Sequence, residues 1–361
     1  MRLKCAPFRN QTLYRQLQLE CPTTSAAHTL NLVATTDAGK GLKTPGLSKL
    51  NNATMGKCSA LWTAAGRPKS SEIIKEILGK DLRYPCVTRW NSLYDSLVQL
   101  DDNKSELNKL MTSLKLPTFK SIELEFIQEY TVVMKPIAVA LDKLQEESNC
   151  YYGTLIPTLL VTQRSLKTNN VNDLRMRHCG PLLSAVVSGF KRRFEKYLNL
   201  EAEITDAVLA TVSHPFFKLR WISLLDAPEF ENKEKTKADI SSRLQLATRK
   251  FSHNNTGQQD SANESGDDLF FNMLEGCSTA PHNQEDLEVL NFFRDPNKSL
   301  SSLRSYPTIE KIFKHYNTPL PSSAPVERLF SFAGMVNSPR RMRLADSKFE
   351  QLVLLKANAG I

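Results

Sequence analysis

The sequence lacks the motifs that most readily reveal an enzyme, a zinc protein or a membrane protein. Its seven cysteines are scattered and never form Cys-x-x-Cys, so there is no ligand set for a zinc ribbon or finger. No stretch approaches the ~20 apolar residues of a membrane-spanning helix, and the first residues lack the apolar run of a secretory signal. A glycine-rich phosphate loop, a Ser-His-Asp arrangement and the surroundings of a nucleophilic cysteine are also missing. We therefore expect an intracellular protein with reduced thiols, no membrane association and no small-molecule substrate.

The bulk composition is that of a globular protein with a basic balance. The chain has 361 residues, of which 41% are hydrophobic and 24% charged, enough to bury one large core or two ordinary ones. Its 47 Lys and Arg residues outnumber its 38 Asp and Glu residues, giving a formal charge of +9 at pH 7. Because cations that neutralise phosphates release counterions, this balance favours polyanionic partners, although many enzymes share it.

Apolar residues recur at helical spacing along most of the chain. The clearest stripe steps by three or four residues along one helical face. Its members are Leu124, Ile127, Tyr130, Met134, Ile137, Leu141 and Leu144. Pro136 lies inside this stripe, and we expect it to kink the helix or split it. Short connections between the helical patterns favour a bundle.

One long stretch differs from the rest in composition. From about Phe251 to Glu285 the residues are mostly Asn, Gln, Ser, Gly, Asp and His, with few aliphatic side chains. A segment that cannot bury apolar surface does not offset the entropy lost on folding, so we predict a disordered linker over 251–285. There is no internal repeat, and no heptad array is long enough for a coiled coil.

The most informative residues lie near the C-terminus. Residues 321–331 read Pro-Ser-Ser-Ala-Pro-Val-Glu-Arg-Leu-Phe-Ser and lead through Ala333-Gly334 to a basic cluster and an apolar tail. Pro325 near the first turn favours a helix whose apolar face leaves Glu327 at its edge. A glutamate in a first turn interacts favourably with the helix dipole and needs no catalytic purpose, which is the reading that spacing alone favours.

This block resembles the C-terminal signature of hAT transposases. Two upstream blocks resemble the same family in the same order: residues 88–94 (Thr-Arg-Trp-Asn-Ser-x-Tyr) its Arg-Trp motif, and residues 27–32 (Ala-His-Thr-Leu-Asn-Leu) its Cys-x-x-His helix. Ser25 stands where that helix should carry cysteine, so we expect His28 to pack in the core. Residues 213–218 resemble an Asp-Pro-x-Phe-Lys element, with His214 in place of Asp, and we interpret them as a structural turn.

The resemblance also indicates which catalytic groups are missing. It implies an RNase H-like core in which two aspartates and one glutamate hold divalent metal ions for strand cleavage and joining. Glu327 corresponds to the glutamate. The family places both aspartates before the Cys-x-x-His helix, and residues 1–24 contain none, with Glu20 as their single acid. We therefore expect Glu327 to be an inactive relic, and the chain to be neither an enzyme nor a cofactor-binding protein.

The sequence leaves two other interpretations of the chain open. A longer isoform or a partner chain that supplies the missing acids would make it a Mg²⁺- or Mn²⁺-dependent DNA transferase. A decayed element would have no activity. The family's BED-type zinc finger also has no counterpart in this sequence.

Candidate DNA contacts follow from the resemblance and from clusters of basic residues. In the family an Arg-Trp pair supports DNA hairpin formation, with the indole stacked on an unpaired base. The alternative is that Trp90 packs in the bundle while Arg89 pairs with a carboxylate such as Asp95 or Asp81. Three roles are open for the basic clusters 191–196 and 340–343: contact with phosphates, an import signal, or a solvated helix face. The DNA-contacting residues that we expect are Arg89, Trp90, Arg340, Arg341 and Arg343.

The resemblance implies a mainly α fold: a helical insertion domain plus a C-terminal remnant of an RNase H-like α/β core. The expected parts are a lead-in at 1–22, a remnant helix with the insertion domain at 23–250, the linker, and a dimerisation region at 286–361. Seven apolar residues there offer more surface than a short two-helix unit can bury. They are Leu329, Phe330, Phe332, Phe349, Leu352, Val353 and Leu355. We expect a non-catalytic nuclear homodimer that contacts DNA.

Overall fold

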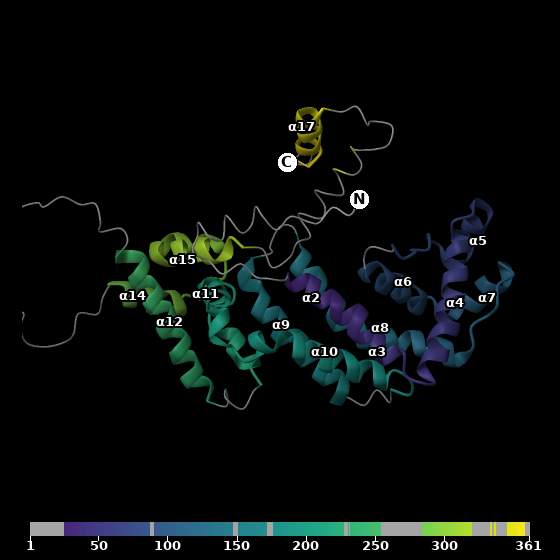
Figure 1. Ribbon diagram of the computed structural model, residues 1–361, viewed down its shortest axis with the longest axis horizontal. Helices are drawn as coiled ribbons and strands as arrows, with labels where there is room; N and C mark the ends of the chain where they lie inside the picture. The colour runs from purple at the N-terminus through teal and green to yellow at the C-terminus, as the bar shows by residue number, and fades with distance from the viewer. Residues whose placement is uncertain are drawn as a thin grey trace, which may run out of the picture. The chain divides into compact units, whose positions relative to one another are not determined.

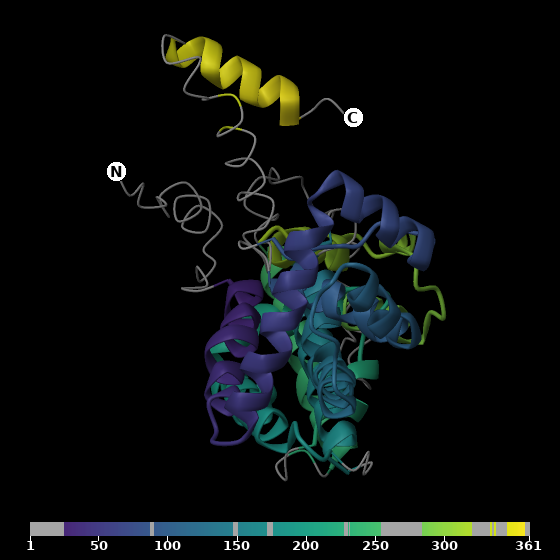
Figure 2. The same ribbon diagram turned by 90° about the vertical axis from the view of Figure 1, so that its right-hand side faces the viewer.

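The regular structure of this protein is helical. The computed structural model describes residues 25–86, 90–146, 151–171, 176–226, 230, 232–253, 284–319, 333, 336 and 345–357. Every regular element in these ranges is a helix (Figure 1 and Figure 2). The mainly α fold class is therefore confirmed, whereas the RNase H-like remnant stays a prediction. No helix within the described ranges is long and apolar enough to cross a membrane.

The described helices form two compact units. Unit 1 contains the described residues of 151–160 and 196–320, and unit 2 contains those of 25–150, 161–195 and 321–361. The division falls within α9 (Leu155–Val171) and α10 (Gly180–Leu198). The domain boundaries expected from the sequence stay predictions. Most of the predicted linker, residues 254–283, lies outside the described residues.

α8 (Ser121–Gln145) is the central helix of unit 2 and confirms the predicted apolar stripe. It packs against α2 (Ala26–Leu32), α4 (Leu47–Ala65) and α6 (Trp90–Asp102) (Figure 1). The stripe residues from Ile127 to Leu144 are at most 2% exposed, and Leu124 is half-buried. Pro136 does not split α8. The proline removes one backbone donor, but the packing of the stripe on both sides of it keeps the helix continuous.

The expectation that His28 packs in the core is wrong. α2 buries Ala26, Ala27 and Leu30, whereas His28 is exposed. At 100° per residue His28 lies on the side of the helix opposite to that buried face. The chain continues through a π-helical turn, η1 (Val33–Asp37), and α3 (Ala38–Leu42). Unit 2 also contains α5 (Pro68–Leu78), α7 (Lys104–Ser113) and α17 (Asp346–Ala357).

α11 (Thr205–Ser213) is the central helix of unit 1, and its residues from Ala207 onward are all buried. It packs against η2 (Tyr152–Thr154), α12 (Lys233–His253) and α15 (Pro307–Asn317). Unit 1 also contains η3 (Ala202–Ile204), η4 (Arg220–Leu224), α14 (Gln284–Arg294) and η6 (Leu300–Ser305).

Gly153 allows η2 and α11 to approach closely. A Cβ at this position would lie 2.4 Å from the carbonyl oxygen of Ala210. Asn317 joins the same two elements to α15: its side-chain oxygen accepts a hydrogen bond from Gly153 N at 2.8 Å, and its amide donates to the Ala210 oxygen at 3.1 Å. Because Ala210 lies near the C-terminal end of α11, this contact fixes the helix end from which the next turn begins.

Candidate functional site

The turn that follows α11 carries the first part of the candidate site. α11 ends at Ser213, as the proline at position 215 predicts. His214 is 7% exposed, lies edge-on to Tyr151 and Phe313, and accepts a hydrogen bond from the Phe216 N–H at its Nδ1 over 3.2 Å. Burial lowers the pKa of His214 to about 4, so this imidazole is neutral at physiological pH. These contacts agree with the interpretation of residues 213–218 as a structural turn.

Lys218 ends this turn with an unusual backbone and a buried side chain. Its φ of 46° places it in the left-handed region, which is uncommon for a residue with a Cβ. The side chain is buried, its Nζ donates to the carbonyl oxygen of Asp295, and the same Nζ lies 4.6 Å from the centre of the Phe292 ring. Burial lowers the pKa of Lys218, the Asp295 carboxylate opposes this shift, and the nearby Arg220 charge adds to it.

The segment after α14 supplies the opposite wall of the site. Asn297 N donates to Asp295 Oδ1 at 2.8 Å, and Ser299 N donates to Asn297 Oδ1 at 2.9 Å. The Tyr306 hydroxyl lies 3.3 Å from Asp295 Oδ2 and donates to it. These hydrogen bonds fix the backbone on both sides of Lys298, because Asx turns of this kind hold a loop locally.

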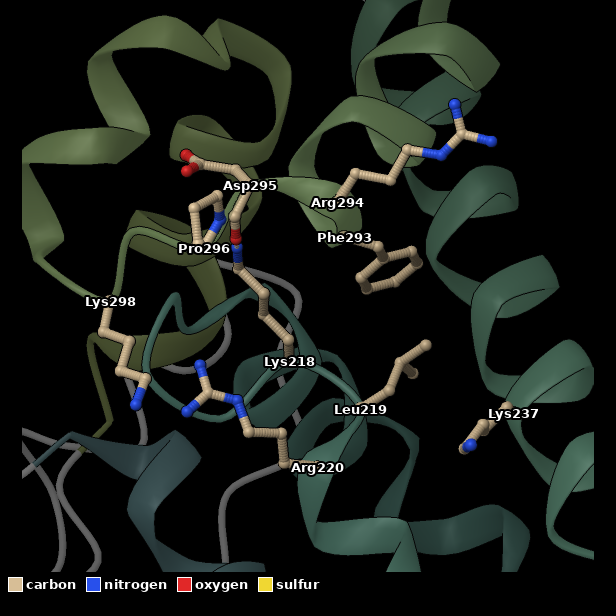
Figure 3. Close-up of a pocket in the computed structure, with 9 residues that line it drawn as sticks. All are labelled: Lys218, Leu219, Arg220, Lys237, Phe293, Arg294, Asp295, Pro296 and Lys298. Atoms are coloured by element: carbon tan, nitrogen blue, oxygen red, sulfur yellow. Dashed lines mark hydrogen bonds between the residues drawn. The ribbon is translucent and has the colours of Figure 1, made fainter.

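The turn and this segment line a pocket of about 610 Å³ that is open to solvent (Figure 3). The lining residues are Lys218, Leu219, Arg220, Lys237, Phe293, Arg294, Asp295, Pro296 and Lys298. Five of them are cationic and one is acidic, a formal excess of four positive charges. In Figure 3 the Arg220 and Lys298 side chains point toward each other, whereas Arg294 extends away from both.

Within the described part of the chain, three of the five cations have neither a side-chain hydrogen bond nor an ion pair. Lys218 donates to a carbonyl oxygen, and Lys237 pairs with Glu234 at 2.7 Å. Arg220, Arg294 and Lys298 are exposed and have no ion-pair partner within the described part of the chain. Unpaired guanidinium and ammonium groups bind phosphate and carboxylate oxygens, so this pocket suits an anionic ligand.

The sequence alone does not predict this pocket. Lys218 lay inside the turn motif, but Arg220, Arg294 and Lys298 are single cations far from any basic cluster. They come together only because α14 and the segment after it fold back onto the turn that follows α11. The one available signal was the match of residues 213–218 to a family element, which we interpreted as structural.

Trp90 lies at the first residue of α6, within the bundle of unit 2. It is half-buried, stacks on Tyr94 at 5.8 Å between ring centres and shares a side-chain hydrogen bond with Tyr130. Its surroundings are acidic: burial raises the pKa of Tyr94 to about 12, and the charges of Asp95 and Asp142 contribute. These contacts are those expected if Trp90 packs in the bundle, and a DNA contact by Trp90 stays a prediction.

The basic cluster at 191–196 forms intramolecular ion pairs. Arg192 donates to Asp37 Oδ1 at 2.7 Å, Arg193 donates to Asp37 Oδ2, and Lys196 pairs with Glu203. Asp37 is 2% exposed and sits against Gly189, where a Cβ would lie 2.6 Å from the Asp37 Cβ. Burial alone would raise the pKa of Asp37, but hydrogen bonds from Arg193 and Arg192 hold it below its ordinary value.

Most of the C-terminal residues singled out in the sequence lie outside the described residues. They are Glu327, Leu329, Phe330, Phe332, Arg340, Arg341 and Arg343, and Arg89 joins them. The other expected dimerisation residues lie on α17. Phe349 and Leu352 are half-buried, Val353 is buried, and Leu355 is 69% exposed. Leu354, which sequence analysis did not name, is 51% exposed beside it.

Comparisons with known proteins do not assign this chain to a family. No protein-family model matches it, and no curated protein matches it. Within the described ranges, no group of three or more His, Cys, Asp or Glu side chains is arranged to hold a metal ion. The cationic pocket of unit 1 is therefore the structural feature on which a functional proposal rests.

Proposed function

We propose that this chain is a transposase-derived, non-catalytic nuclear protein that binds DNA at the cationic pocket of unit 1 and dimerises through its C-terminal region. The observation that carries the proposal is the set of exposed, unpaired cations at Arg220, Arg294 and Lys298. The resemblance of three ordered sequence blocks to hAT transposases supports it. The metal-dependent alternative depends on Glu327 and stays a prediction.

The charge arrangement favours a polyanion over a single carboxylate ligand. Arg220 comes from the first residue of η4, Arg294 from the last residue of α14, and Lys298 from the segment after it. Cations spread over an open pocket in this way match the repeated charges of a phosphate backbone. Each phosphate that a cation neutralises releases counterions, which gives binding energy in dilute salt.

Dimerisation is supported by α17. Its residues 352–355 are four consecutive apolar side chains, which at 100° each surround most of the helix. A helix that packs on one face cannot bury all four, and Leu354 and Leu355 remain exposed. Contiguous apolar surface of this kind is typical of an interface, and a second copy of this chain is the occupant that the resemblance implies.

DNA binding is tested by removing two pocket charges. The variant Arg220→Gln/Lys298→Gln should bind a labelled DNA duplex about tenfold or more weakly than wild type at low salt, measured by fluorescence anisotropy. Lys49→Gln/Lys69→Gln is the matched control, because it removes the same charge from exposed positions of unit 2. Equal losses in both variants would indicate only a net-charge effect, and unchanged affinity in the pocket variant would reject the proposed site.

A further inference from the structure

Phe216 is an aromatic side chain exposed beside the cationic pocket. It is 52% exposed, whereas its neighbours His214, Pro215 and Lys218 are all buried. Single exposed apolar residues are common and need no explanation by themselves. Phe216 differs because hydrogen bonds to His214 hold the turn that carries it.

Hydrogen bonds hold the turn in the conformation that exposes this ring. The Phe216 N–H donates to His214 Nδ1 at 3.2 Å, and the Phe217 and Lys218 N–H groups both donate to the His214 carbonyl at 3.0 Å. The Phe217 ring meets the Phe216 ring edge-on, with 5.1 Å between ring centres. The aromatic surface is thus presented by a rigid backbone, which reduces the entropy lost when a ligand binds it.

Arg220 connects this ring to the pocket. Its guanidinium carbon lies 5.8 Å from the centre of the Phe216 ring, a cation–π contact, and the same residue lines the pocket. An exposed aromatic surface and an unpaired guanidinium therefore lie side by side at the edge of a cationic pocket. Base rings stack on aromatic side chains and on guanidinium planes, while phosphates bind the surrounding cations.

We propose that Phe216 and Arg220 form a stacking platform for an unpaired base, so that the pocket binds single-stranded nucleic acid in preference to duplex. This inference rests on the proposed function, because the cations of the same pocket hold the phosphates. The bases of an intact duplex are stacked on each other and cannot present a face to Phe216. A strand with free bases satisfies both parts of the site.

The test compares three labelled DNA probes of equal length: a single strand, a duplex, and a single strand in which every base is absent. Wild type should bind the single strand more tightly than either of the others. Phe216→Ala should weaken single-strand binding about 5- to 150-fold, the loss of one stacked base at about 1 to 3 kcal/mol. It should leave the affinities for the duplex and the abasic strand unchanged, and Phe216→Trp should retain single-strand affinity.

Tyr84→Ala is the matched control, because Tyr84 is another exposed aromatic residue, 69% accessible, in unit 2. It should leave all three affinities unchanged. The inference is overturned if Phe216→Ala leaves single-strand affinity unchanged, or if it weakens the abasic strand equally. If Arg220→Gln/Lys298→Gln still reduces binding in that case, the pocket remains a nucleic-acid site without a stacking platform. If neither variant reduces binding, the proposed function fails as well.

Discussion

At the residue scale, the candidate site depends on two buried ionisable side chains, His214 and Lys218. His214 holds the turn through its ring nitrogen and its carbonyl oxygen, and it does so as a neutral imidazole. Lys218 donates to the Asp295 carbonyl and covers the Phe292 ring. Lys218 lines the pocket and His214 fixes the turn that carries it, whereas Arg220 and Lys298 are exposed in the pocket and Phe216 is exposed beside it.

His214 should make the stability of this protein sensitive to mild acid. Its folded-state pKa of about 4 lies below the ordinary value of 6.5, so the unfolded chain takes up a proton first as the pH falls. The resulting stability is fully present above pH 6.5 and is lost progressively toward pH 4. Between pH 7 and pH 5 the loss should be about 2 kcal/mol.

The variant His214→Asn tests this pH dependence, because its side-chain oxygen still accepts from Phe216 N but does not titrate. Urea unfolding at pH 7 and pH 5 should show that the variant loses about 2 kcal/mol less than wild type over this interval. His315, whose pKa burial also lowers, is present in both proteins and cancels in the comparison. Equal losses in the two proteins would show that His214 is already solvated in the native state.

The sequence predicted the structural role of some residues correctly and of others wrongly or not at all. Pro215 marked the end of α11 because proline has no amide hydrogen and restricts the residue before it. His28 was placed wrongly, because a histidine in a short apolar stretch gives no sign of which side of the helix it occupies. The pocket cations were missed, since Arg220 and Lys298 lie 78 positions apart in the sequence and only tertiary folding joins them.

At the element scale, the start of α10 depends on a side chain from another helix. Glu129 of α8 accepts hydrogen bonds from the N–H groups of Arg177, His178 and Cys179, at 2.9, 3.0 and 2.7 Å. These amides immediately precede α10. A carboxylate there satisfies donors at the helix start and interacts favourably with the positive end of the helix dipole.

Glu129→Ala should destabilise the protein by about 2 kcal/mol, because these amide donors lose their acceptor. Glu129→Gln should fall between this variant and wild type. Glu125 provides a matched control on the same helix: it contacts Arg177 at 3.6 Å and His178 Nε2 at 3.4 Å and is 44% exposed, so Glu125→Ala should cost about 0.5 kcal/mol or less. Chemical denaturation measures all three variants, and similar costs at both positions would contradict the capping role.

The junction of η2, α11 and α15 should not tolerate a side chain at Gly153. The Cβ of Gly153→Ala would lie 2.4 Å from the Ala210 oxygen and 2.8 Å from its carbonyl carbon, both backbone atoms of a buried helix. We expect a loss of about 2 kcal/mol or more in thermal or chemical unfolding. Gly56→Ala is the control, since nothing lies within 4 Å of its Cβ, and it should be neutral or slightly stabilising.

Elements with a strong periodic pattern were predictable, and those set by tertiary contacts were not. The stripe of α8 was recognisable because its buried residues repeat at helical spacing over the whole helix. Pro136 suggested a break that the packing on both sides prevents. The π-helical turn Val33–Asp37 had no local signal, since it accompanies the approach of Asp37 to Arg192 and Arg193 from α10.

At the scale of the whole molecule, dimerisation through α17 is the next expectation. Leu354→Asp/Leu355→Asp places two charges on the exposed apolar surface and should convert a dimer into a species of one chain mass, 40.7 kDa. Light scattering of the purified protein measures this change.

Leu246→Asp/Leu287→Asp is the matched control for the α17 variant. These leucines are also exposed, at 56% and 43%, but lie on α12 and α14 of unit 1. The control should remain a dimer. A monomeric wild-type protein, or a dimer that survives the α17 substitutions, would contradict the interface.

The class of the whole fold was predictable from the sequence, whereas the functional surface was not. Helical periodicity and short connections predicted a mainly α protein without reference to any tertiary contact. The cationic pocket combines a turn, a helix end and a loop from distant parts of unit 1. A net charge of +9 indicated polyanionic partners but gave no position for them.

The salt dependence of DNA binding by the pocket variant tests whether this pocket holds phosphates. The logarithm of the binding constant for a DNA duplex should fall linearly with the logarithm of the salt concentration in wild type. In Arg220→Gln/Lys298→Gln this slope should be shallower by about two, because two phosphate contacts are lost. Identical slopes in the two proteins, or no DNA binding by wild type at low salt, would show that this pocket does not bind nucleic acid.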